Sequence, residues 1–205
     1  MRLFALAVLV FAGLGAVPAG AQNQTPGATP VRVAGTIDKL DGMSLTVKAK
    51  DGDAVTVTMA DGVGIYGVEK RTVADIKPGD FLASGGVKGA DGRIHAVEVR
   101  IYPPSLRGTG EGQRPWAARS DGVMTNATVG TVSQSPDGGM VHVTYKGGES
   151  DFAVGLDVPV LAYVEADRSL LKPGAAVLIF AQKQADGGLT TSRVTAEKDG
   201  VKPPI

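Results

Sequence analysis

The residues best suited to chemistry lie in one segment near the middle of the chain, residues 107–116, with the sequence Arg-Gly-Thr-Gly-Glu-Gly-Gln-Arg-Pro-Trp. Clustered glycine amides can point at one anion, and two guanidiniums can each hold a carboxylate or phosphate through paired hydrogen bonds. The one tryptophan of the chain ends the segment and offers a flat wall for stacking. The segment therefore predicts a site for a carboxylate, a phosphate or an acidic sugar, built from Arg107, Gly108, Gly110, Glu111, Gly112, Arg114 and Trp116.

A structural interpretation explains the same segment without a ligand. Trp116 would plug the space between two folded units, and Glu111 would pair with Arg107 or Arg114 to fasten the linker. The segment is not a nucleotide fingerprint, because its glycines fall as G-x-G-x-G and Pro115 prevents the helix that would receive a phosphate. The structural and ligand-binding interpretations are compatible, and both stay open.

Candidate catalytic and metal-binding residues are few. The only histidines, His95 and His142, each alternate with apolar neighbours, as outward-facing strand residues do. The chain has no cysteine, no closely spaced histidine pair and no G-x-S-x-G sequence. We therefore expect no catalytic residue, no metal site and no cofactor. The alternative is a hydrolase or lyase with a site at the same junction, formed by Glu111, Arg107, Arg114 and a carboxylate of either unit.

The elements around this segment form an internal repeat. Residues 33–100 and residues 128–195 match at a constant offset of 95 residues. The matched positions include Gly35 with Gly130, Lys77-Pro78-Gly79 with Lys172-Pro173-Gly174, and Asp91-Gly92 with Asp186-Gly187. A register kept through turn residues predicts one fold copied in tandem.

Each unit has the pattern of a β-meander. Apolar and polar residues alternate over 31–38, 44–48 and 55–59, which predicts half-buried strands. Asp41-Gly42, Asp51-Gly52 and Asp61-Gly62 follow them and suit tight hairpins. A fourth strand near 63–68, a helical turn that Thr72 begins, a type II turn at 77–80 and two further strands complete a unit of about six strands.

Short strands of this kind favour closure, because a closed barrel leaves no open sheet edge. Gly35 and Gly130, each inside the first strand of a unit, are typical of a bulge at a barrel corner. The predicted fold class is all-β, with two tandem OB-like barrels over residues 31–102 and 127–200. A Gly/Arg/Trp linker, residues 103–126, would join them, and residues 201–205 would form a tail.

One segment, residues 175–181, breaks the alternation. With Val177 and Ile179 pointing inward, Leu178 and Phe180 face outward. We expect these two side chains to pack against the other unit or the linker, and the alternative is a partner-binding edge.

The N-terminus has the three parts of a signal peptide. Arg2 precedes an apolar run over 3–17, and Ala19-Gly20-Ala21 supplies the small residues of a cleavage site. We predict a signal peptide over residues 1–21, cleavage after Ala21 and a flexible segment over 22–30. The 15-residue run is shorter than the roughly 20 residues of a spanning helix, so no membrane span is expected in the mature chain. An uncleaved anchor is the alternative.

Charge and cysteine content narrow the partners and the compartment. Removal of residues 1–21 leaves 20 basic and 21 acidic residues, a net charge of −1, which argues against a nucleic-acid partner. An exported chain without disulfides is typical of a bacterial periplasm.

The sequence also resembles a known group of proteins. The matching stretches are residues 33–52, 73–81, 91–99, 107–116 and 124–129. On these, the chain is similar to the bacterial exported proteins grouped as DUF5666-type repeats. The resemblance implies a periplasmic all-β protein of unknown function. Gln113 stands where that pattern is expected to have histidine, which argues against metal binding by the linker.

Together these features predict an exported, non-catalytic binding or interaction module that contacts its ligand at the linker. The expected partner is an envelope protein, a polymer or a small anionic ligand. Besides the enzyme already named, a purely structural envelope or transport accessory protein is the remaining alternative.

Overall fold

The computed structural model describes residues 29–49 and 52–204. Over these ranges the chain forms twelve strands and three single turns of 3₁₀ helix, without an α-helix, which confirms the all-β prediction. No helix in this part of the chain has the length and apolar character needed to span a membrane. The predicted signal peptide lies outside the described residues, and so do residues 22–28 of the segment that is expected to be flexible. Residues 29 and 30 of that segment belong to the first strand.

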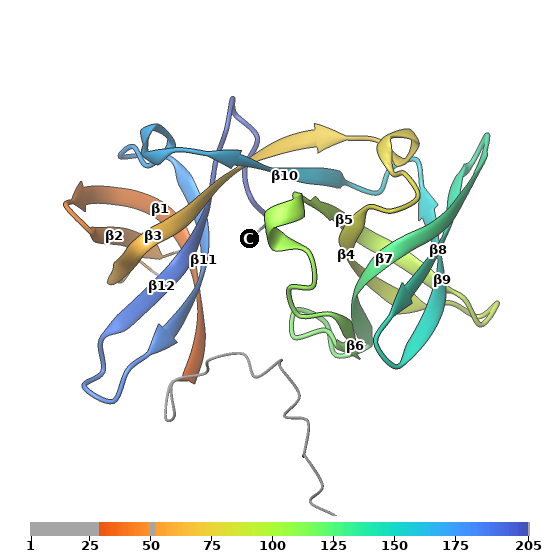
Figure 1. Ribbon diagram of the computed structural model, residues 1–205, viewed down its shortest axis with the longest axis horizontal. Helices are drawn as coiled ribbons and strands as arrows, with labels where there is room; N and C mark the ends of the chain where they lie inside the picture. Colours follow the sequence, from red (N-terminus) through yellow and green to blue (C-terminus); the bar gives the residue numbers. More distant parts are fainter. Residues whose placement is uncertain (1–28, 50–51, 205) are drawn as a thin grey trace, which may run out of the picture.

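Five strands close into a mixed barrel, on the left in Figure 1. β1 pairs with β2 and β11, β2 pairs with β3, and β11 pairs with β12. β3 and β12 complete the ring in parallel through six residue pairs. The five strands are β1 (Thr29–Asp41), β2 (Ser44–Ala49), β3 (Ala54–Arg71), β11 (Ala176–Lys183) and β12 (Leu189–Ala196).

A second strand group, on the right in Figure 1, follows the same order of pairings. It consists of β4 (Phe81–Lys88), β5 (Ile94–Tyr102), β7 (Gly122–Ser135), β8 (Gly138–Tyr145) and β9 (Gly148–Gly155). β5 and β9 meet in parallel at only two residue pairs. The short β6 (Gly112–Pro115) adds to β7. β10 (Val160–Ala166) pairs with both β3 and β5 and so connects the second strand group to the barrel.

The two groups have separate cores. Alternate residues of the barrel strands point inward, and those fully buried there include Leu45, Val47, Val57, Val177 and Ile179. The second strand group buries its own set, which includes Leu82, Val99, Val141, Val143 and Phe152. Each group therefore excludes water from its own interior, and a ligand has to bind outside both cores.

The barrel differs from the predicted arrangement because it is not built from one consecutive stretch of chain. It takes β1, β2 and β3 from the first half of the sequence and β11 and β12 from the second. The second strand group likewise combines β4 and β5 with three later strands. The physical reason lies in the end of β3: residues 68–71 continue beyond β12 along β10 and carry the chain toward β4, which pairs with β7.

The predicted hairpin at Asp61-Gly62 is therefore wrong. β3 continues through these residues as one strand of 18 residues, with Gly62 at φ 71°. The pairing with β12 passes from Met59 to Gly64 across this point, so the extra residues bulge out and the chain does not reverse. The second half of β3 pairs with both β10 and β12, and this pairing keeps the strand extended.

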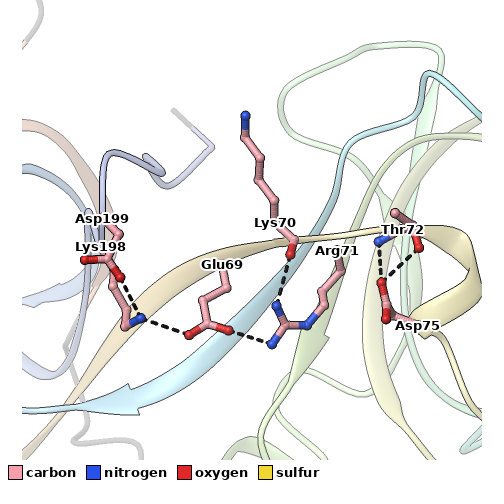
Figure 2. Close-up of polar contacts among 7 residues, drawn as sticks. All are labelled: Glu69, Lys70, Arg71, Thr72, Asp75, Lys198 and Asp199. Atoms are coloured by element: carbon pink, nitrogen blue, oxygen red, sulfur yellow. Dashed lines mark hydrogen bonds and ion pairs between the residues drawn. The ribbon is translucent and has the colours of Figure 1, made fainter.

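The turns predicted at 41–42, after Thr72 and at 77–80 are confirmed, and the turn predicted at 51–52 includes residue 51, which lies outside the described residues. Gly79 has φ 89° and the Asp80 N–H donates to the Lys77 carbonyl at 3.0 Å, as a type II turn requires. Before it, the 3₁₀ turn η1 (Val73–Asp75) begins after Thr72. The Thr72 N–H and hydroxyl both donate to the Asp75 carboxylate, at 2.8 and 2.9 Å (Figure 2), and these bonds lower the pKa of Asp75.

Between the barrel and the second strand group lies a third, smaller cluster. It contains Tyr66, Val68, Leu106 and Tyr163. Tyr102 stacks on Tyr163 with 5.3 Å between ring centres, and burial raises the pKa of the Tyr163 hydroxyl to about 12. This cluster holds together the strands that cross between the two groups.

The C-terminal segment is fastened to β3 beside this cluster. Lys198 donates to Glu69 at 2.9 Å, and Arg71 donates to the same carboxylate at 2.5 Å (Figure 2). These bonds hold the pKa of Glu69 below its ordinary value. Val201, the first residue of the predicted tail, pairs with Lys198 through two backbone hydrogen bonds, so the tail is anchored at its start.

Candidate functional site

The candidate linker is held at both ends. The 3₁₀ turn η2 (Pro104–Leu106) places Leu106 in the central cluster, where it is buried. β6 then pairs antiparallel with the start of β7, and the Trp116 N–H donates to the Gly122 carbonyl at 2.9 Å. Since β7 begins at Gly122, the last part of the predicted linker 103–126 is strand.

A groove of about 670 Å³ lies beside this linker, between the barrel and the second strand group, and we call it the central groove. Its barrel wall is formed by Arg32, Leu178, Phe180 and Arg193. Its opposite wall comes from β5 and β7 and contains Glu98, Arg100, Tyr102, Met124 and Asn126. The linker contributes Thr109, Gly110 and residues 114–118, and Pro204 of the C-terminal segment completes the lining.

Three of the seven predicted site residues line the central groove: Gly110, Arg114 and Trp116. Arg107 lies away from it and donates to the Gly79 carbonyl at 2.6 Å, which ties the linker to the turn before β4. Glu111 accepts a hydrogen bond from the Lys146 N–H at 3.1 Å. The expected ion pair between Glu111 and either linker arginine is not formed in the described structure, because Glu111 points to the β8–β9 turn.

Gly108 and Gly112 also lie outside the lining. Both have positive φ, 79° and 120°, which only glycine adopts without strain, so the turns of the linker explain them. They do not form an anion nest together with Gly110 in the groove.

Trp116 forms part of the wall of the second strand group and packs closely on two glycines. A Cβ added at Gly85 or at Gly122 would lie 2.8 Å from carbon atoms of its ring. Glycine at these two positions therefore makes the seat for the indole. The ring is half-buried and borders the groove, and both glycines on which it packs belong to the second strand group; the predicted stacking on a ligand stays a prediction.

Arginine dominates the charge of the groove. Arg100 is ion-paired with Glu98, and these side chains are 12% and 15% exposed. The other three guanidiniums have no carboxylate partner among the described residues. Arg32 donates to the Pro204 carbonyl at 3.3 Å, and Arg114 donates to the Gly110 carbonyl at 2.9 Å. Arg193 lies over the Phe180 ring at 6.0 Å.

The buried polar groups of the wall are mostly satisfied. Asn126, 3% exposed, donates to the Thr109 carbonyl at 2.8 Å and accepts from Arg114 at 3.5 Å. It therefore positions the linker arginine. The Nε atom of Arg100 is buried without a hydrogen-bond partner.

Sequence reasoning identified two of the four residues of the barrel wall and missed the other two. Only Leu178 and Phe180 gave a signal, through the broken alternation of β11; Leu178 is 2% exposed and Phe180 is 48% exposed, and both line the groove. Arg32 and Arg193 are ordinary outward arginines of strands far from the linker in sequence, and no local pattern marks them.

The two histidines lie elsewhere. His95 is bound to Asp91 at 3.1 Å, and His142 to Asp151 at 2.9 Å. Neither borders the groove. Within residues 29–49 and 52–204, no group of three or more histidine, aspartate or glutamate side chains is arranged to hold a metal ion.

Comparison with protein-family models, with curated proteins and with solved structures found no match for this chain. Fold and site therefore define its class by themselves: an all-β protein with a closed five-stranded barrel and an arginine-lined groove beside it.

Proposed function

We propose that the chain is a non-catalytic binding module that takes an anionic ligand in the central groove. One observation carries this proposal: Arg32, Arg114 and Arg193 line one groove without a carboxylate partner in the described structure. The chain as a whole has 21 basic and 21 acidic residues, so this local excess of positive charge is not a consequence of composition. Guanidiniums gathered in a concave site attract an anion and bind it through charge-assisted hydrogen bonds.

The size and lining of the groove support a ligand with a substantial apolar or ring-shaped part. Its volume of about 670 Å³ lies within the range of about 300–1,000 Å³ that small-molecule sites occupy. Tyr102, Trp116 and Phe180 supply aromatic surface there. A short stretch of an envelope polymer or a single small anion would both fit.

We further propose that this binding takes place after export to a bacterial periplasm. The signal-peptide pattern of residues 1–21 and the absence of cysteine support it. The resemblance to the DUF5666-type repeats points in the same direction. A nucleic-acid partner is disfavoured because the charge balance of the chain is even.

The architecture proposed for this module is two copies of one OB-like unit that have exchanged strands. The support is that the strand pairings occur in couples related by 95 residues: Ile65 pairs with Val194, and Val160 pairs with Val99. β3 and β10 cross where Val68 pairs with Tyr163, the residue that lies 95 positions after Val68 in the sequence. Each barrel-like half would then contain strands of both copies.

Two linker arginines provide the test of ligand binding. Arg114→Ala removes a groove guanidinium, whereas Arg107→Ala removes one that lies outside the groove. We expect citrate and inorganic phosphate to quench or shift Trp116 fluorescence in the parent protein. Arg114→Ala should weaken their binding about tenfold, which corresponds to a loss of about 1.4 kcal/mol. Arg107→Ala should leave the affinity unchanged.

Two results would contradict the proposed function. One is the absence of any fluorescence or calorimetric response to either anion at millimolar concentration. The other is an equal loss of affinity in both variants while circular dichroism shows both folded.

A further inference from the structure

The central groove contains two pairs in which an aromatic ring lies beside an arginine that has no carboxylate partner among the described residues; Arg100, near Tyr102, is paired with Glu98. On the barrel wall, the Arg193 guanidinium lies 6.0 Å from the centre of the Phe180 ring. On the opposite side, Arg114 and Trp116 line the groove from the end of β6, two residues apart. Residues at that spacing in an extended chain point to the same side. We call these the barrel half-site and the linker half-site.

The half-sites lie at corresponding places of the two strand groups. β4 and β11 have bounds that differ by 95 residues, and Gly85 of β4 corresponds to Phe180 of β11. Gly85 has no side chain, and the Trp116 ring covers it, with 2.8 Å between ring carbons and an added Cβ. At Gly85 the linker therefore provides an aromatic ring, Trp116, whereas β11 has its own ring, Phe180, at the corresponding position.

We propose that the central groove binds an acidic oligosaccharide and that the two half-sites hold two of its anionic sugars. This inference rests on the proposed function and names the ligand class for the same site. Each sugar would place an apolar ring face on the aromatic side chain and its carboxylate against the neighbouring guanidinium. Two similar half-sites on facing walls match a ligand whose charged ring repeats.

A sugar chain fits these observations better than a nucleic acid. A nucleic-acid groove follows one phosphate per nucleotide with a continuous row of cations, and such proteins carry a basic excess. Here the basic and acidic residues are equal in number, and the groove itself contains Glu98. Trp116 also has its inner face on Gly85 and Gly122, which leaves one face for a ring.

Trp116 makes the experiment possible without a label, because it is the only tryptophan and it borders the groove. Fluorescence titration and calorimetry of the full chain would compare trigalacturonate, galacturonate, maltotriose and a thymidine tetranucleotide. Citrate serves as the general anion probe. Since two linked sites bind a divalent ligand with a local concentration advantage, we expect trigalacturonate to bind at least about tenfold more tightly than galacturonate. Maltotriose should not bind measurably.

Variants of the barrel half-site separate two-site binding from general attraction. Arg193→Ala should weaken the binding of trigalacturonate at least about tenfold and the binding of galacturonate less than about threefold, because the linker half-site remains for the monomer. Phe180→Ser, at a half-exposed position, is a second variant if Arg193→Ala fails to fold. Arg168→Ala, which removes an exposed arginine outside the groove, is the matched control and should bind trigalacturonate like the parent.

The outcomes distinguish the inference from the function on which it rests. Citrate binding combined with equal affinity for trigalacturonate and galacturonate would leave the anion site standing and overturn the two-sugar inference. Tighter binding of the tetranucleotide than of trigalacturonate would overturn it in favour of a nucleic acid. No binding of any anion would overturn the proposed function itself.

Discussion

The barrel and the second strand group use the same order of strand pairings but complete them differently. β3 and β12 close the barrel through six residue pairs, whereas β5 and β9 join through two. The barrel also carries its own ring, Phe180, toward the groove, while the second group has Gly85 there and receives Trp116 from the linker. One order of strand pairings therefore forms a closed barrel on one side of the groove and, with the linker added, the opposite wall on the other side.

Two corresponding strands, β1 of the barrel and β7 of the second strand group, show the same contrast at one position. Gly130 lies at a bulge, between the registers of Val129 and Thr131, as the sequence predicts. Gly35 lies in regular pairing, and the bulge follows after Ile37. At Gly35 the requirement is close approach, because an added Cβ would lie 2.1 Å from the Lys48 carbonyl oxygen.

This difference gives the largest expected effect. Gly35→Ala forces two backbones of the closed barrel apart and should lower the free energy of unfolding by about 3 kcal/mol. Gly130→Ala meets only the His142 ring at 3.1 Å, which can move, and should cost less than about 1 kcal/mol. Urea denaturation measures both. Equal losses would mean that the chain is as closely packed at Gly130 as at Gly35, which would contradict this expectation.

Trp116 and Phe180, which face the groove from opposite walls, should also differ in how much they stabilise the fold. Trp116→Ala empties the seat on Gly85 and Gly122 and should cost about 2 kcal/mol, below the range for fully buried rings. Phe180→Ala removes a ring that is 48% exposed and should cost less than about 1 kcal/mol. Thermal melts followed by circular dichroism test this order. A larger loss for Phe180→Ala would show that the ring stabilises the barrel more than its exposure implies.

A smaller effect is expected from the seat itself. Gly85→Ala places a methyl group 2.8 Å from two carbons of the Trp116 ring, so the indole has to tilt toward the groove. We expect a loss of about 1 kcal/mol in stability and a red shift of the tryptophan emission. The corresponding change on the barrel, Phe180→Ala, should leave the emission maximum unchanged. An unshifted spectrum in Gly85→Ala would mean that the indole does not rest on this strand.

The smallest effect concerns the fastening of the C-terminal segment to β3. Lys198 and Arg71 lower the pKa of Glu69 from its ordinary value of 4.5. A carboxylate with a lowered folded-state pKa contributes stability above its unfolded-state pKa and loses it as pH falls through the folded value. Glu69→Gln should therefore melt slightly earlier than the parent at pH 7, and the difference should shrink as pH falls below 4.5 through the lowered pKa of Glu69.

The matched control is Asp199→Asn, because Asp199 is the more exposed partner of Lys198, at 83% against 29% for Glu69. It should change the melting temperature less than Glu69→Gln at neutral pH. A difference that does not shrink as pH falls below 4.5 would show that Glu69 acts through packing and not through charge.

Much of the local structure could be predicted from sequence. Alternating residues identified β1 and β2, and Pro78-Gly79 identified the turn before β4. Asp61-Gly62 misled the prediction, because the same dipeptide that reverses a hairpin also suits a bulge when both neighbours of the strand continue.

The candidate site could be predicted only in part. Arg114, Gly110 and Trp116 lie together in the sequence, so their composition revealed them. Arg32 and Arg193 are 161 residues apart and come together through β1, β11 and β12. A residue that acts through a distant partner leaves no local signal.

Short strands with glycine turns, and one segment rich in arginine, glycine and tryptophan, follow from the order of the residues alone. These are properties of neighbouring residues, set by backbone conformation and the alternation of side chains. Only the tertiary structure decided which strands close the barrel and which face the linker across the central groove. Pairing depends on where β3 carries the chain, and alternation within a strand specifies its buried face without specifying its partner.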